Sequence, residues 1–122
     1  MSYELLNQGT FLHIRFFGVM ESKDLRDLFQ EFKTYEETKD VIPYRITTLS
    51  DIDDFIIQFS TLFPVAEDRK QKKFNPPLKS AVVASRPIEA IIAGMLRSLN
   101  MNKTIIIQVF NTFSEAKKWV HE

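Results

Sequence analysis

The sequence predicts an α/β domain built on a mostly parallel five-stranded sheet. Strand-like and helix-like segments alternate in the order ββαβαβαβα, which is typical of right-handed crossovers between parallel strands. Residues 79–84 and 104–110 are almost continuously apolar, as expected of strands that are buried on both faces. We therefore expect a two- or three-layer domain whose first strand is an antiparallel edge.

The N-terminal region predicts a β-hairpin. Residues 3–6 and 10–17 flank a turn, and the second segment alternates, so its side chains divide between two faces of the sheet. One face is wholly apolar. The other includes His13 and Arg15, so we expect that face to be only half covered. Gly18 is expected to end the strand.

The middle of the chain predicts a helix, a strand and a second helix. Apolar residues at helical spacing predict a helix over residues 22–38, capped by Ser22, and a β-branched run predicts a strand over residues 44–49. Capping residues at 50–54 then precede an apolar stripe, which indicates a second helix directly after them. Pro64 should kink or interrupt that helix, because proline lacks a backbone N–H.

The C-terminal third contains the clearest local signals. Pro87 fits the first turn of a helix, and a strand over residues 104–110 follows. Thr112 and Glu115 form an S/T-x-x-E capping box, in which each side chain satisfies a free backbone N–H. The short helix that they begin carries Trp119, the only tryptophan of the chain. We interpret this tail as structural.

Composition limits the class of protein. The 122 residues suit one domain, residues 1–122, and the net charge of zero disfavours nucleic-acid binding, which depends on neutralising phosphates. Without cysteine there can be no disulfide and no Cys-ligated metal. The sequence has no signal-peptide pattern and no apolar run near 20 residues. We expect a cytoplasmic protein with no cofactor and no membrane insertion.

The expected binding site lies at the rim of the sheet, because open α/β sheets bind ligands beyond the carboxyl ends of their strands. Asp51, Asp53 and Asp54 at this rim could hold a hard cation. A role in capping a helix is favoured, and we assign no metal. Arg86 could hold an anion beside a helix N-terminus, although a solvated arginine, or one paired with the aspartates, is favoured. The rim residues expected to contact a ligand or partner are Ser50, Asp51, Asp53, Asp54, Arg86 and Asn111.

Four segments together carry a resemblance to a known family. They are the opening hairpin, the strand that ends at Ser50-Asp51, the short strand 81–84, and the ending Val109-Phe-Asn-Thr-Phe-Ser-Glu-Ala-Lys-Lys-Trp-Val120. In this order they resemble the SpoIIAA-like domains, relatives of the STAS (sulfate transporter and anti-sigma factor antagonist) fold. The ending is similar to the tail of bacterial SpoIIAA-like proteins of undefined function. The resemblance covers nearly the whole chain and implies a SpoIIAA-like domain.

The chain departs from this family at one place that matters for function. STAS-type anti-sigma factor antagonists carry an Asp-Ser-Ser-Gly-like turn after a central strand, and a partner kinase phosphorylates its serine. At the matching place this chain has Ser50 without a glycine, crowded by three aspartates. Since these carboxylates would repel a phosphate group, we do not expect Ser50 to be phosphorylated.

Two functions remain open at this stage. No motif of a hydrolase, a P-loop or a metalloprotease is present, so an enzyme is not expected. The first hypothesis is a non-enzymatic regulatory module that contacts a protein partner or a second copy of itself in a homodimer. The alternative is a carrier or sensor of a small apolar, lipid-like ligand in a pocket near the second and third helices. Apolar stripes at 55–63 and 88–99 motivate both.

Overall fold

The computed structural model describes residues 2–122 and has the predicted order of elements. The strands are β1 (Tyr3–Asn7), β2 (Phe11–Glu21), β3 (Tyr44–Ile56), β4 (Leu78–Val83) and β5 (Ile105–Phe110). The helices are α1 (Ser22–Thr38), α2 (Phe63–Arg69), α3 (Pro87–Leu99) and α4 (Phe113–Val120), with a 3₁₀ turn, η1 (Phe59–Leu62), before α2. None of the helices within residues 2–122 is long and apolar enough to cross a bilayer.

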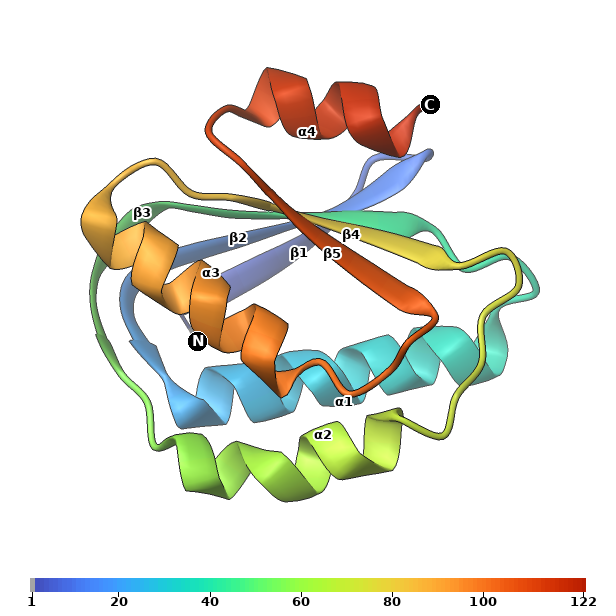
Figure 1. Cartoon of the computed structure of the whole chain (residues 1–122), viewed down its shortest axis with the longest axis horizontal. Coiled ribbons are helices and arrows are strands. Elements are labelled where there is room, and N and C mark those ends of the chain that lie inside the picture. The colour runs from blue at the N-terminus through green and yellow to red at the C-terminus, as the bar shows by residue number, and fades with distance from the viewer. Residues whose placement is uncertain (1) are drawn as a thin grey trace.

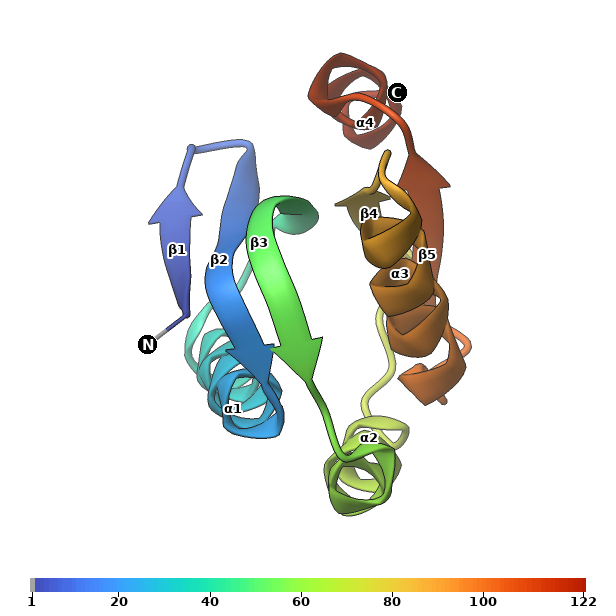
Figure 2. The same cartoon turned by 90° about the vertical axis from the view of Figure 1, so that its left-hand side faces the viewer.

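The five strands form one sheet in the order β1-β2-β3-β4-β5. β1 is antiparallel to β2, and the remaining neighbours are parallel, as the sequence predicts. Figure 2 shows the strands side by side in chain order. Because each crossover leads to the next strand along, α1, α2 and α3 share one face of the sheet, and α4 covers part of the other (Figure 1). The domain therefore has three layers.

The larger core lies between the sheet and the three crossover helices. The apolar face of β2 contributes Leu12, Ile14 and Phe16, each of which is almost completely buried. From α1, Leu25 and Leu28 pack in the same cluster. The period-two alternation along β2 and the helical spacing along α1 thus produce the two surfaces that meet here.

The opposite face of the sheet is covered only where α4 lies. The ring of His13 packs against Phe113 with centroids 5.0 Å apart, whereas Arg15, further along β2, remains half-exposed. Thr112 caps α4 by accepting a hydrogen bond from the backbone N–H of Glu115 at 3.2 Å, as the capping signature predicts. The prediction that this face of the sheet is only half covered is confirmed.

The predicted end of β2 at Gly18 is wrong. The strand continues to Glu21, and Gly18 lies within it at φ +66°. The register between β2 and β3 shifts before and after this glycine, and at each shift β3 has one residue more than β2, which indicates bulges in β3 opposite this part of β2. Glycine adopts a positive φ without steric cost, so the strand bends at this position and still keeps its pairing.

The helix start predicted at residues 50–54 is also wrong. β3 runs on to Ile56, and residues 51, 52 and 54–56 pair with residues 17–21 of β2. The acidic residues are therefore strand residues and do not cap a helix. Capping residues favour a helix start only when the backbone has no better partner. Here the extended part of β2 supplies that partner, and tertiary pairing overrides the local preference.

The starts of the first two helices differ in detail from the prediction. Glu21, and not Ser22, is the N-cap of α1, and its backbone N–H donates to Asp24 at 2.8 Å. Ser22 instead accepts a hydrogen bond from the N–H of Gln58 at 2.7 Å, which joins the start of α1 to the residue before η1. Pro64 lies in the first turn of α2. The predicted second helix is thus a 3₁₀ turn followed by a short α-helix.

We predict that His13 makes the stability of this protein depend on pH. Burial lowers the pKa of His13 below its ordinary value of 6.5 and Arg15 lowers it further, while Glu4 partly opposes them. Protonation therefore costs more in the folded state than in the unfolded chain. The free energy of unfolding should decrease as the pH falls from about 6.5. Urea unfolding between about pH 7.5 and about pH 5 measures this decrease.

The control is His13→Gln, which cannot titrate and can still hydrogen-bond to Thr48, whose hydroxyl lies 3.0 Å from His13 Nε2. The variant should lose less stability over this range than the wild type. Equal losses in the two proteins would show that His13 does not cause the effect.

Candidate functional site

The predicted rim is held together by Arg86. Its Nη2 donates to the carbonyl oxygens of Ser50 at 3.2 Å and Ile52 at 2.8 Å. Its Nε is bonded to the carboxylate of Glu89, which is only 1% exposed. The structure thus places Arg86 beside Ser50, but the guanidinium binds main-chain oxygens and Glu89 and not the rim aspartates. It ties the start of α3 to β3.

The other rim residues do not gather around one point. Asp51 accepts a hydrogen bond from Arg15 at 2.8 Å, and Asp54 accepts one from the backbone N–H of the next residue at 2.8 Å. Asp53 is exposed, and Asn111 is exposed in the turn between β5 and α4. Within residues 2–122, no three His, Cys, Asp or Glu side chains are grouped to hold a metal ion. Ligand or partner contact at the rim stays a prediction.

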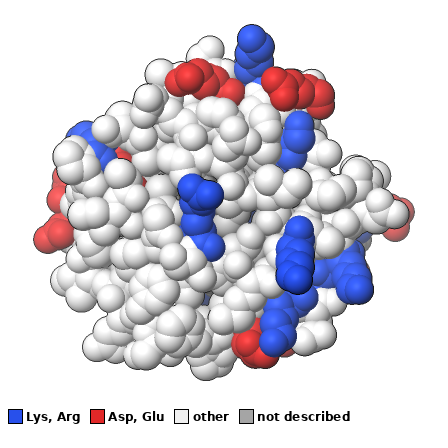
Figure 3. Space-filling model, viewed as in Figure 1, with Lys and Arg blue, Asp and Glu red and all other residues white. Residues whose placement is uncertain are grey.

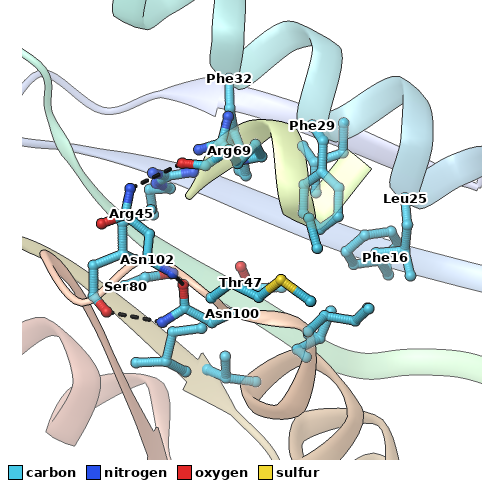
Figure 4. Close-up of a pocket in the computed structure, with 18 residues that line it drawn as sticks. Phe16, Leu25, Phe29, Phe32, Arg45, Thr47, Arg69, Ser80, Asn100 and Asn102 are labelled. Atoms are coloured by element: carbon cyan, nitrogen blue, oxygen red, sulfur yellow. Dashed lines mark hydrogen bonds between the residues drawn. The ribbon is translucent and has the colours of Figure 1, made fainter. Parts of the chain in front are cut away.

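A more concentrated site lies between the sheet and α1, α2 and α3. A cavity of about 80 Å³ opens there (Figure 4). Since one water needs about 10–15 Å³, the space suits several waters or one short organic molecule. Twelve of its 18 lining residues are apolar. The six polar ones are Arg45, Thr47, Arg69, Ser80, Asn100 and Asn102.

A buried charge cluster forms one end of this site. Arg69 of α2 holds the carboxylate of Glu36 from α1 with two hydrogen bonds, of 3.2 and 2.6 Å. Arg45 of β3 reaches the same carboxylate with its Nη2 only at 3.5 Å. The three side chains are between 5% and 11% exposed. Two buried cations therefore share one anion, which leaves one positive charge uncompensated.

Arg45 is the poorly satisfied member of this cluster. Its Nη2 is buried and makes no hydrogen bond with any residue of the described chain, 2–122. The guanidinium carbon lies 3.9 Å from the centroid of the Phe32 ring. The attraction between a cation and an aromatic face replaces only part of the hydration that the cation loses on burial. Burial lowers the pKa of Arg45 to about 9, with Arg69 adding to the effect and Glu36 opposing it.

Asn102 fixes the wall next to this cluster. Its side-chain amide donates to the carbonyl oxygens of Arg69, at 3.0 Å, and of Lys72. Its side-chain oxygen accepts from the backbone N–H and the hydroxyl of Thr104, at 2.9 and 2.6 Å. These bonds join the end of α2 to the loop before β5. The loop and α2 are thus fixed relative to each other and form one wall of the cavity.

The sequence predicts a pocket near the second and third helices but does not identify the polar residues of this site, although one signal is available. Arg45, Thr47 and Leu49 are spaced two residues apart along β3 and must share a face of the sheet. Arg45 is therefore expected to lie beside buried apolar residues. Glu36 likewise falls four residues after Phe32, on the apolar side of α1. The sequence does not reveal that these two residues and Arg69 meet, because they come from three separate elements.

Comparison with known proteins bears on the fold alone. The sequence matches no protein-family model and no curated protein. The structure is similar to that of an uncharacterized protein from the DUF3478 family with a SpoIIAA-like fold, from Shewanella loihica PV-4. The TM-score is 0.58 at 10% sequence identity, over 97% of this chain and 91% of that one. The fold is SpoIIAA-like. The predicted SpoIIAA-like character of the domain is thereby confirmed at the level of the fold.

We predict that Arg45 lowers the stability of this SpoIIAA-like domain when its cavity holds no ligand. Arg45→Met keeps the length of the side chain and removes the surplus charge, so the free energy of unfolding should rise by about 1–3 kcal/mol. Glu36→Gln leaves two buried cations without an anion and should lower it by about 3–5 kcal/mol. Urea unfolding at neutral pH measures both changes. A destabilised Arg45→Met protein would mean that Glu36 already compensates both arginines.

Proposed function

We propose that this protein is a non-enzymatic carrier or sensor that binds a small, largely apolar molecule in the cavity between the sheet and α1, α2 and α3. The observation that carries the proposal is the cavity itself. Protein interiors are packed about as densely as organic crystals and contain few voids larger than a water. A mainly apolar space with a few polar groups at one end is the usual form of a small-molecule site.

The partial exposure of the apolar lining supports this proposal. Phe29, Leu96 and Ile107 belong to the wall and remain half-exposed, and Met101 at the loop before β5 is 40% exposed. A bound apolar molecule would remove part of this surface from water, which is favourable by roughly 25 cal/mol for each Å². Methionine is flexible and adapts to bound molecules of different shape, so Met101 suits the entrance.

Regulation through protein contacts, the first hypothesis from the sequence, stays a prediction. Eight large apolar side chains of the described chain are exposed, and no helix or strand contributes more than one of them. Single exposed apolar residues are normal on protein surfaces, whereas partner sites usually have contiguous patches. The exposed apolar residues come from separate elements, so no single helix or strand presents an apolar face to a partner.

We predict that a neutral apolar probe, 1-hexanol, binds in the cavity. Titration into ¹⁵N-labelled protein should shift the backbone amide signals around Leu25, Val82 and Leu96 in a saturable way, and leave those of α4 unchanged. Ala66→Leu adds volume where Ala66 lines the wall at 5% exposure, so hexanol affinity should fall about tenfold or more, because the space is filled.

Ala90→Leu is the matched control, since Ala90 is exposed on α3 and the same change there leaves the cavity intact. It should bind hexanol as the wild type does. Circular dichroism confirms that both variants are folded. The proposal fails if hexanol produces no saturable shifts in the wild type, or if Ala66→Leu binds as tightly as Ala90→Leu.

A further inference from the structure

We infer that the ligand of this cavity is a monocarboxylate with a short apolar chain, and that Arg45 binds its carboxylate. The inference rests on the proposed function, because it names the class of molecule that the same cavity takes. It is carried by the charge of the cavity wall, by a buried donor without a partner, and by the separation of polar and apolar residues within the cavity.

The charge of the wall is entirely positive. Arg45 and Arg69 are the two charged residues that line the cavity within the described chain, and Glu36 is not part of the lining. Glu36 lies behind the arginines, where Arg69 occupies both of its oxygens. An incoming molecule therefore meets two guanidinium groups, of which one is already neutralised. The surplus is a single positive charge, which a monoanion would balance and a dianion would exceed.

The hydrogen-bonding capacity of Arg45 points the same way. Its Nη2 is buried without a hydrogen-bond partner in the described chain, and a buried unpaired donor is costly. A guanidinium can bind a carboxylate through two parallel N–H···O bonds. That Nη2 lies 3.5 Å from the Glu36 carboxylate, so a carboxylate in the cavity would offer acceptors to the guanidinium from the cavity side and supply the missing negative charge together. A neutral molecule could supply only the acceptor.

The arrangement of the lining residues matches a molecule with one charged end. In Figure 4, Arg45, Arg69, Ser80, Asn100 and Asn102 gather at one end of the cavity, and Phe16, Leu25 and Phe29 lie at the other. The carboxylate would lie at the first end and the hydrocarbon chain would extend toward the second. The volume of about 80 Å³ limits the buried part to a short chain.

The outer surface near the cavity is suited to attract an anion. Figure 3 shows Lys and Arg side chains gathered over the region where α2 and α3 end, although the whole chain has no net charge. Residues 69–73 include four basic residues, and Lys103 follows Asn102 of the cavity wall. A local positive potential raises the rate at which anions arrive.

The test compares hexanoate with 1-hexanol, which has the same chain and no charge, by amide-shift titration and calorimetry at neutral pH. The wild type should bind hexanoate about 10- to 100-fold more tightly, as expected for a buried charge-assisted hydrogen bond. Arg45→Met should remove this preference and leave hexanol affinity unchanged or higher. Arg26→Met, which changes an exposed arginine of α1, should behave as the wild type does.

The outcomes separate this inference from the proposed function. If hexanol binds and hexanoate binds no more tightly, the monocarboxylate assignment is overturned and the apolar site stands. If neither probe binds, both fail. A hexanoate preference that survives in Arg45→Met would place the carboxylate elsewhere and would also overturn the assignment.

A measurement on the wild type keeps the inference testable even if Arg45→Met does not fold. Hexanoate labelled with ¹³C at the carboxyl carbon reports its own protonation by NMR. Bound beside Arg45, the ligand should stay ionised at lower pH than free hexanoate, because a neighbouring cation favours the carboxylate. Protonation of bound hexanoate at the same or a higher pH than free hexanoate would contradict the contact.

Discussion

The parallel pairing of β2 with β3 is the constraint on which the rest of this structure depends. The ladder continues past the register shifts around Gly18 to the end of both strands, and there Ser22 joins the start of α1 to Gln58. The alternation of side chains along β3 turns Arg45 toward the helices. One ladder thus determines where α1 begins, where the η1–α2 segment begins, and which charged residue enters the core.

The buried cluster of Arg45, Glu36 and Arg69 is unusual for its balance of charges. A buried ion pair often contributes little net stability, because desolvation offsets the attraction between the charges. Here a second cation is added without a second anion, and its Nη2 has no hydrogen-bond partner within residues 2–122. Proteins depart from the rules of stable packing mainly at functional sites. The position of this departure, in the wall of a cavity, is consistent with the proposed ligand binding.

The fold and the function rest on different observations in this protein. The SpoIIAA-like fold is shared with a protein of 10% identity, so the shared property is the path of the backbone. A shared fold carries many unrelated functions. The proposed ligand binding therefore rests on the residues of this chain: the apolar wall, the unpaired donor of Arg45, and the wall that Asn102 fixes between α2 and β5.

The sequence by itself determined the order of elements, the α/β class and the capped C-terminal helix, because these depend on periodicity and on residues a few positions apart. Only the tertiary structure decided that residues 50–54 belong to a strand, since their partner lies in β2, more than 30 residues earlier. It also decided the candidate site. Arg45, Glu36 and Arg69 lie on three elements, and whether side chains from separate elements fill the space between them or leave a cavity depends on packing in three dimensions.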